Sequence, residues 1–443
     1  MSVAIINMRH PLVSLFAPLA LAACASSSST ATPDGGVDAT SDATPDGGAT
    51  GCPDGFAGAG CVLALHDRAV ADCDPEVVTL LRGELDARAK LGPLWSAGRA
   101  LFRTATPVQI AGGFNDWSTT ELPSRAVCGS DLIVAVGAVT TGHWPYKLFD
   151  GQTWSLDPRD PAFAYDDYAG NPDGKNSILN TPDSGRGHLA RLDRACSSAL
   201  GNCRDVTAYL PPGYAAPARS ATKYPVLFMH DGQNVWDDHD CCFGHTGWEL
   251  NVALDTEIAA GRVAPIIVIA GDNTTARNNE YGLSSQAMTT FMQFQVTELQ
   301  PAALAQVQWN GARVAVGGSS LGGLVSMHLA LTYPQTYAAA ASLSGAFWPN
   351  NNALRDQLPT YGKQPLAIYL DHGGNVAANS DGAADTVDVR DVLDGLGWQV
   401  STSPACTATS DTICYHSEPG ATHDELAWKA RTWRFLRFLF PAP

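Results

Sequence analysis

A serine lies at the centre of a short glycine-flanked motif, GSSLG at 318–322. The motif follows an apolar run at 313–316, expected as a strand, and opens an apolar helical stretch at 321–331. Flanking glycines allow a sharp strand-to-helix turn, which would present the Ser320 hydroxyl at a helix N-terminus. The N–H of Leu321 would then point to the position where an oxyanion forms. This context predicts Ser320 as the nucleophile of an acyl-transfer reaction.

A serine nucleophile needs a base, because an unassisted hydroxyl reacts poorly. His423 lies in a glycine-containing loop immediately before a predicted helix, where its ring can face a nucleophile. His372 and His416 are its rivals, but the first precedes the loop expected to carry the acid and the second ends a predicted strand. We therefore expect His423 to be the base.

The acid of such a triad should come between the serine and the histidine in the chain. The loop after the predicted strand 366–370 offers Asp371, Asp381 and Asp385. Asp371 is nearest the strand end, whereas Asp381 and Asp385 lie just before a predicted helix. The residues alone do not separate the three.

Elements of two kinds alternate around these residues. Short apolar runs, typical of buried strands, are separated by helical stretches such as 287–306 and 321–331. This alternation predicts a doubly wound α/β domain over 190–443, with a mostly parallel sheet covered on both faces. The apolar runs lie at 206–210, 224–229, 266–270, 313–316 and 366–370.

Several segments of this domain resemble the esterase D/enterochelin-esterase-like family of α/β-hydrolases, whose relatives include feruloyl and acetyl-xylan esterases and mycolyltransferases. The resemblance implies Ser320 as nucleophile, His423 as base and no cofactor or metal. It favours Asp381 as the acid, although the loop at 373–380 is longer than the usual turn of the family. It also implies that the backbone N–H of Gln233 joins that of Leu321 in an oxyanion hole. The matching segments are HDGQN at 230–234, GWELN at 247–251, NNEY at 278–281, the GSSLG motif and GATHDELAW at 420–428.

A region of strands and turns at 98–185 precedes the α/β domain. Its motifs GGFNDW at 112–117 and WPYKLFDG at 144–151 resemble the early-set, immunoglobulin-like β-sandwich of carbohydrate-binding module 48. Trp117 and Trp144 could stack on sugar rings; the alternative is that they pack the sandwich. A small cysteine-bearing leader is expected at 52–97, with a helix at 75–90.

The N-terminus predicts export. Residues 1–23 have the charge and short apolar run of a signal peptide, and LAAC at 21–24 resembles a bacterial lipobox with Cys24 as the lipidated residue. The following residue, Ala25, implies the outer membrane of a Gram-negative cell or a cell surface. Residues 24–51 are low in apolar side chains and are expected to form a disordered linker.

Ten cysteines follow Cys24, and an even number in an exported protein predicts disulfides. Cys196 with Cys203, and Cys406 with Cys414, are near enough in sequence to be natural pairs. Cys241 and Cys242 could bridge each other or two separate partners.

The segment 230–245 is rich in metal-ligand residue types, but adjacent cysteines lack the spacing of a zinc site. We expect instead an acidic, disulfide-held loop over the active site. The residues concerned are His230, Asp237, Asp238, His239, Asp240, Cys241, Cys242 and His245.

Net charge and hydropathy argue against two classes of protein, those that bind nucleic acid and those that span a membrane. A net charge of −17 over 443 residues argues against a nucleic-acid partner, and no run after the N-terminus reaches the ~20 apolar residues of a membrane span. We expect a secreted, lipid-anchored serine esterase that hydrolyses carbohydrate-linked carboxylic esters of acetyl or feruloyl type. The alternatives are a siderophore esterase, for which Arg277 is one candidate cation, an acyltransferase, or a non-catalytic glycan-binding surface lipoprotein.

Overall fold

The computed structural model describes residues 51–171, 174–239, 241–242 and 246–443. The predicted signal peptide, Cys24 and most of the predicted linker lie outside these residues. Within them, no helix has the length and apolar character needed to cross a bilayer.

Two helices, α1 (Ala59–Asp72) and α2 (Pro75–Ala87), begin the described chain after a short turn of helix, η1 (Gly55–Gly58). The helix expected at 75–90 is confirmed and ends three residues earlier. Asp74 caps it, because its carboxylate accepts the Glu76 N–H at 2.8 Å, and Pro75 stands at the first helical position, where no N–H is needed.

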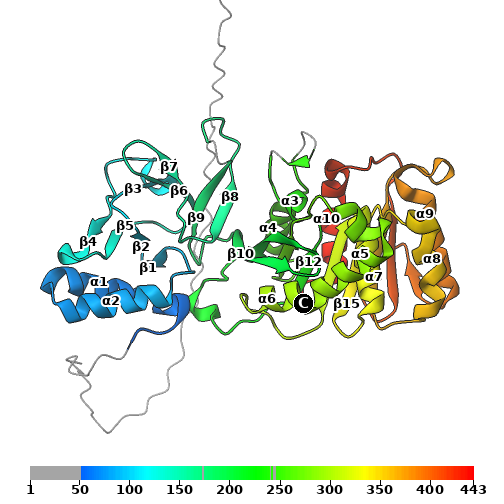
Figure 1. The fold of residues 1–443 in the computed structure, drawn as a ribbon, viewed down its shortest axis with the longest axis horizontal. Helices are drawn as coiled ribbons and strands as arrows, with labels where there is room; N and C mark the ends of the chain where they lie inside the picture. The colour runs from blue at the N-terminus through cyan, green and yellow to red at the C-terminus, as the bar shows by residue number, and fades with distance from the viewer. Residues whose placement is uncertain (1–50, 172–173, 240, 243–245) are drawn as a thin grey trace, which may run out of the picture. The chain divides into compact units, whose positions relative to one another are not determined.

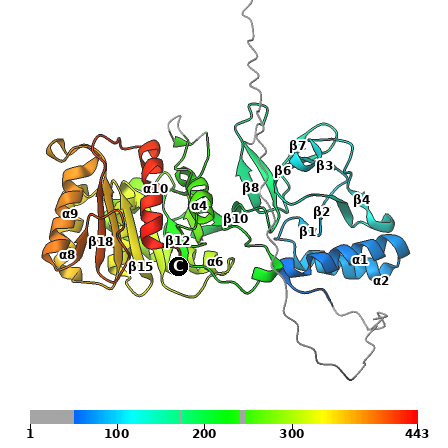
Figure 2. The same cartoon turned by 180° about the vertical axis from the view of Figure 1, so that it is seen from behind.

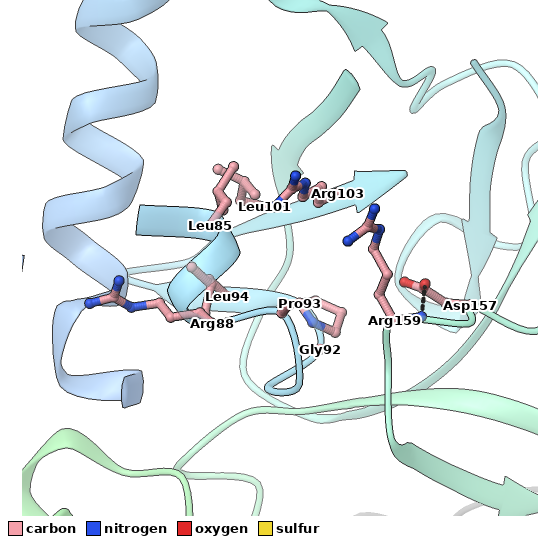
Figure 3. A pocket seen from close by; sticks show the side chains of 10 residues that line it. Leu85, Arg88, Gly92, Pro93, Leu94, Leu101, Arg103, Asp157 and Arg159 are labelled. Atoms are coloured by element: carbon pink, nitrogen blue, oxygen red, sulfur yellow. Dashed lines mark hydrogen bonds between the residues drawn. The ribbon is translucent and has the colours of Figure 1, made fainter. Parts of the chain in front are cut away.

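The helical pair is packed on strands rather than standing apart as a leader. Leu85 of α2 meets Leu94 and Leu101 of two neighbouring strands in one apolar cluster (Figure 3). The boundary expected at residues 97 and 98 falls inside a hairpin, since β1 (Leu94–Ser96) pairs with β2 (Arg99–Thr104). Burial of the inner faces of α1 and α2 therefore requires the sheet that follows.

The β-rich region has two layers. One is a four-stranded sheet in the order β1-β2-β5-β4, and the other contains β3, β6, β7, β8 and β9. Phe102, Tyr146 and Leu148 are members of one buried cluster that joins them. The further bounds are β3 (Gln109–Gly112), η2 (Gly113–Asn115), β4 (Arg125–Ala126), η3 (Val127–Gly129), β5 (Ile133–Ala138), β6 (His143–Phe149), β7 (Trp154–Ser155), β8 (Ala162–Tyr165) and β9 (Lys175–Asn180).

The second layer continues into the α/β domain, because β8 pairs with β10 and the described residues form one 14-stranded sheet. From β10 onward its order is β10-β11-β13-β12-β14-β15-β16-β18-β17, antiparallel up to β13 and parallel beyond. The strands are β10 (His188–Ser197), β11 (Asn202–Leu210), β12 (Val226–Met229), β13 (Ile267–Gly271), β14 (Val314–Ser319), β15 (Tyr337–Leu343), β16 (Ala367–His372), β17 (Gln399–Ser401) and β18 (Thr412–Ser417).

Helices cover both faces of the parallel sheet, with α5 and α7 in front in Figure 1 and α10 and α4 in front in Figure 2. The bounds are η4 (Pro217–Arg219), α3 (Gly232–Val235), α4 (Leu250–Ala259), η6 (Asn279–Leu283), α5 (Ser285–Phe294), η7 (Gln295–Leu299), α6 (Gln300–Leu304), α7 (Leu321–Thr332), α8 (Pro349–Tyr361), η8 (Val376–Ala378), η9 (Ser380–Gly382), α9 (Ala383–Gly395) and α10 (Glu425–Leu439).

Strand β12 shows why its sequence is apolar throughout. Val226 and Phe228 belong to the core beneath α5 and α7, whereas Leu227 and Met229 belong to the core beneath α4 and α10. Alternate side chains thus face opposite helical layers, as in any doubly covered sheet. The predicted doubly wound α/β domain is confirmed.

Four disulfides join described cysteines: Cys52–Cys61, Cys73–Cys128, Cys196–Cys203 and Cys241–Cys242. The Cys196–Cys203 prediction is confirmed, and the ambiguous adjacent pair bridges itself. The pairing predicted for Cys406 and Cys414 is wrong, since both are free. Both thiols pack on the core beneath α10, where burial raises the pKa of Cys414. Sequence separation alone does not reveal whether two packed thiols meet the narrow geometry of a bridge.

Candidate active site

Ser320 occupies a sharp turn between β14 and α7. Its φ of 54° and ψ of −125° lie in a region that non-glycine residues rarely adopt. The turn is held on both sides, because Ser320 N–H donates to the Leu343 carbonyl and Ser320 carbonyl accepts from Ala346 N–H, each at 3.0 Å. A Cβ on Gly318 would lie 2.8 Å from the Gly322 backbone, which explains the flanking glycines.

Ser320 is the accessible serine of this part of the fold. It is half-buried, whereas Ser319, Ser342 and Ser344 are buried. A substrate can therefore approach the hydroxyl at 320 but not the other three.

His423 and Asp381 are in direct contact. The His423 Nδ1 lies 2.6 Å from Asp381 Oδ1, and the histidine side chain is 40% exposed whereas that of Asp381 is 2% exposed. Trp428, one turn into α10, packs edge-on against the imidazole with ring centroids 5.2 Å apart. A buried carboxylate thus holds one ring nitrogen of a histidine whose other face reaches solvent.

The three acids suggested by the sequence have different surroundings. Asp381 lies in η9 and accepts hydrogen bonds at Oδ2 from Ser344 Oγ (2.7 Å) and from Gly373 N–H. Asp371 is fully buried against Arg431 at 3.0 Å. Asp385 is bonded to Asn379 at 3.1 Å on the exposed side of the loop. Of these acids, Asp381 is the one that meets His423.

The rival histidines have other partners. His372 is buried between the Gly373 carbonyl and the Tyr415 hydroxyl, each at 2.6 Å. His416 pairs with Glu418 at 2.8 Å.

The backbone N–H groups expected in an oxyanion hole belong to the first turns of two helices. Leu321 is the first residue of α7 and Gln233 the second of α3, positions whose N–H groups a helix leaves without an internal acceptor. The two helix starts are adjacent, because His230 N–H donates to the Gly317 carbonyl at 2.9 Å and a Cβ on Gly322 would lie 3.3 Å from that of His230.

Polar contacts fix α3 in place. The Gln233 side chain accepts Asn273 N–H at 3.0 Å, and Asn234 donates to Glu425 of α10 at 3.1 Å. The second contact joins the turn carrying Gln233 to the helix that follows His423.

The buried His230 precedes Asp231 in the chain and the half-buried Arg277 contacts it, next to the start of α3. Arg277 makes a two-pronged ion pair with Asp231, at 2.6 and 2.7 Å, so its charge is already matched. Burial lowers the pKa of His230 to about 4, which keeps the imidazole neutral at pH 7.

The two tryptophans of the β-rich region differ. Trp144 is half-buried, donates Nε1–H to the Thr140 carbonyl at 2.8 Å and packs against the sandwich core. Trp117 is 38% exposed and lies 6.2 Å, centroid to centroid, from the equally exposed Trp154. Trp117 and Trp144, not Trp154, were the side chains named as examples for stacking on sugar rings.

In the described part of the chain, no three or more histidine, cysteine or acidic side chains are placed so that they could hold a metal ion together. Asp240 and His245 of the ligand-rich segment lie outside the described residues.

Ser344, Trp428 and Arg431 form a polar group behind Asp381 to which sequence reasoning assigned no role, although Trp428 ends the matching segment at 420–428. Ser344 follows a run of apolar residues, and the other two read as members of an amphipathic helix. Only the meeting of β15, η9 and α10 reveals them.

A doubly wound sheet with a strained serine turn and a histidine–aspartate pair defines an α/β-hydrolase-type fold. The family model described as "Putative esterase" matches residues 197–430. The chain belongs to this family, which includes enterochelin-esterase-like proteins, and it is therefore a hydrolase that acts on esters.

Named relatives are distant. The chain is 24% identical over 239 residues to the uncharacterized protein YbbA of Bacillus subtilis, a match covering 50% of this chain and 86% of that protein. It is 29% identical over 207 residues to the iron(III) enterobactin esterase of Dickeya dadantii, covering 46% of this chain and 43% of that protein. A solved ferulic acid esterase matches with a TM-score of 0.45 at 16% identity, over 58% of this chain and 98% of that one.

Proposed function

We propose that this protein is a serine esterase in which Ser320 is the nucleophile, His423 the general base and Asp381 the acid that orients it. The contact between His423 Nδ1 and Asp381 Oδ1 at 2.6 Å carries the proposal. Such a contact fixes the tautomer of the imidazole, so that Nε2 is free to accept the serine proton.

The reaction has two steps. Ser320 Oγ bonds to the ester carbonyl carbon as its proton passes to His423 Nε2, and the carbonyl π electrons move to oxygen. Collapse of this intermediate breaks the bond to the alkoxy oxygen, which leaves as an alcohol with the proton from His423. Water then attacks the acyl-enzyme, giving one proton to His423, and the departing Ser320 oxygen recovers that proton as the acid is released.

The oxyanion of both steps would lie between the N–H groups of Leu321 and Gln233. Loss of one such donor costs about 2.7–4 kcal/mol of transition-state stabilisation in other hydrolases. The contacts that hold α3, Asn273 to Gln233 and Asn234 to Glu425, support this assignment.

The proposed substrates are carbohydrate-linked carboxylic esters of acetyl or feruloyl type. Arg277 is neutralised by Asp231, so it offers no spare cation for an anionic triscatecholate. The exposed Trp117 and Trp154 rings favour a carbohydrate as the part of the substrate that carries the ester, because aromatic faces stack on pyranose rings. Products formed from acetylated xylan, a feruloyl sugar ester and a catecholate triester separate these substrates, and an added alcohol acceptor separates hydrolysis from acyl transfer.

The decisive experiment is hydrolysis of p-nitrophenyl acetate by the wild type and by Ser320→Ala. We expect the variant to lose roughly 10⁴- to 10⁶-fold in kcat. Ser342→Ala is the matched control, since Ser342 is a buried serine whose hydroxyl has no hydrogen-bond partner among the described residues. Equal rates for wild type and Ser320→Ala would refute the serine mechanism. If neither hydrolysed the ester while both bound xylan or starch, a glycan-binding lipoprotein would replace it.

We also propose export with a lipid anchor at Cys24. The disulfides among the described residues favour an oxidising compartment. Membrane fractionation and fatty-acid labelling of the wild type and of Cys24→Ser test this: the label should be lost in the variant.

A further inference from the structure

Ser344 lies immediately after β15, with a φ of 46° and no exposed surface. Its neighbour Leu343 holds the Ser320 N–H, so the same strand end supports both the proposed nucleophile and the residue behind the acid. Nothing reaches Ser344 from solvent, which excludes it as a second nucleophile.

The Ser344 hydroxyl has three partners and uses its full capacity. It lies 2.7 Å from Asp381 Oδ2, 2.9 Å from Arg431 Nη2 and 3.1 Å from Trp428 Nε1. A hydroxyl has one proton and two lone pairs. Because the arginine and the indole can only donate, the single Ser344 proton must point at Asp381.

The buried Asp371–Arg431 ion pair holds Ser344 in turn. The Asp371 carboxylate accepts the Ser344 N–H at 3.0 Å and forms an ion pair with Arg431 at 3.0 Å, both side chains being at most 2% exposed. The Tyr369 hydroxyl also donates to Asp371 at 3.1 Å. Ser344 is thus fixed at its amide and at its hydroxyl by one buried ion pair.

We infer that Ser344 is a positioning residue that fixes the Asp381 carboxylate, so that Oδ1 faces His423. This inference rests on the proposed function. Gly373 N–H and Ser344 Oγ–H both donate to Oδ2, which leaves Oδ1 for the histidine. Asp371 and Arg431 hold Ser344 in place, and Ser344 in turn holds the Asp381 carboxylate.

The arrangement affects the pH profile as well as the rate. The charged and titratable groups around Asp381 are His423 before α10, Arg431 on α10 and, bonded to Arg431, Asp371 on β16. A carboxylate that loses a hydrogen-bond donor takes up a proton more readily and attracts a neighbouring imidazolium more strongly. For a variant that lacks the Ser344 hydroxyl, both effects predict that activity is lost at a higher pH than in the wild type when the solution is acidified.

The test compares Ser344→Ala and Ser344→Gly with wild type and Ser342→Ala. We measure kcat/KM for p-nitrophenyl acetate as a function of pH, together with the melting temperature. Both Ser344 variants should lose about 10- to 100-fold in kcat/KM. The acid limb of their pH profile, where kcat/KM falls at low pH, should shift to higher pH. Ser342→Ala should keep the wild-type limb. Glycine tolerates the positive φ at 344, so this variant remains informative if the alanine variant folds poorly.

An unchanged rate and acid limb in a folded Ser344→Gly would overturn the inference. A lower melting temperature with an unmoved limb would also overturn it, because the residue would then be merely structural. Failure of the proposed function is distinguishable, since Ser320→Ala would then be as active as the wild type.

Discussion

Two buried pairs of aspartates, one in each half of the described chain, have opposite surroundings. Asp371 and Asp381 of the α/β domain receive donors from Arg431, Ser344 and His423. In the β-rich region, Asp157 and Asp160 share the buried Tyr146 hydroxyl, at 2.9 Å from each. Each carboxylate also accepts one backbone N–H at 2.9 Å, from Arg159 and Ala162 respectively, and neither is bonded to a charged side chain among the described residues.

The difference shows what burial does to carboxyl groups whose hydrogen-bond donors are all uncharged. Burial raises the pKa of Asp157 and raises that of Asp160 well above its usual range. Arg159 donates its backbone N–H to Asp157 (Figure 3), and Arg191 donates to the Asp160 backbone carbonyl, but these hydrogen bonds and the two positive charges offset only part of the effect of burial. One Tyr146 proton serves two carboxyl groups, which favours retention of a proton by the pair.

The largest expected effect lies in the α/β pair. Asp381→Asn should lower kcat by about 10⁴-fold, because an amide donor opposite Nδ1 imposes the wrong imidazole tautomer. Steady-state hydrolysis of p-nitrophenyl acetate measures this. Asp385→Asn, in the same loop but bonded to Asn379, is the matched control and should remain close to wild type. Equal losses in the two variants would mean that the loop, not the acid, was perturbed.

Asp371→Asn tests the stability that the buried ion pair supplies. It leaves the Arg431 guanidinium buried without its counter-ion, which should cost about 3–5 kcal/mol of unfolding free energy. Urea unfolding followed by tryptophan fluorescence gives the change. Asp160→Asn should cost far less at pH 7, because an amide can donate to the Tyr146 oxygen and leave its proton for Asp157. Equal destabilisation of both variants would contradict the proposed difference between the ion-paired Asp371 and the uncharged surroundings of Asp160.

The β-rich pair should make stability depend on pH. A carboxyl group whose folded pKa is raised binds more protons in the folded state, so stability is full below the unfolded value of about 3.9 and falls as pH rises toward the folded value. Asp160→Asn should weaken this fall, so the variant should become more stable relative to the wild type as pH rises. Urea midpoints from pH 4 upward provide the measurement. A constant difference between variant and wild type would show that Asp160 is ionised throughout.

The smallest effect concerns Trp428→Phe. The change removes the Nε1 donor to Ser344 while a ring remains against His423, so kcat/KM should fall by about 2- to 10-fold, as for one neutral hydrogen bond. A loss larger than that of Ser344→Ala would place the role of Trp428 in its ring contact instead.

Features that depend on residues close together in the sequence could be predicted, whereas those that depend on contacts between distant segments could not. The α/β domain, the helix at 75–87 and the Cys196–Cys203 bridge were predictable because apolar periodicity, a proline with its capping aspartate, and a short hairpin are local features. The division at residue 97 and the Cys406–Cys414 pair were wrong, since both depend on what packs against a segment. The roles of Ser320, His423 and the two oxyanion donors remain predictions that the geometry supports.

The sequence by itself determined a doubly wound domain with a glycine-flanked serine and a loop histidine, because spacing along one chain encodes turns and periodic faces. Spacing alone did not separate three aspartates that follow the same predicted strand, and the family resemblance favoured Asp381. Only the tertiary structure chose between them: Arg431 from the last helix neutralises Asp371, and Ser344 from the adjacent strand turns Asp381 toward His423. Those partners come from distant segments, and side-chain direction in a folded core is set by such neighbours rather than by sequence position.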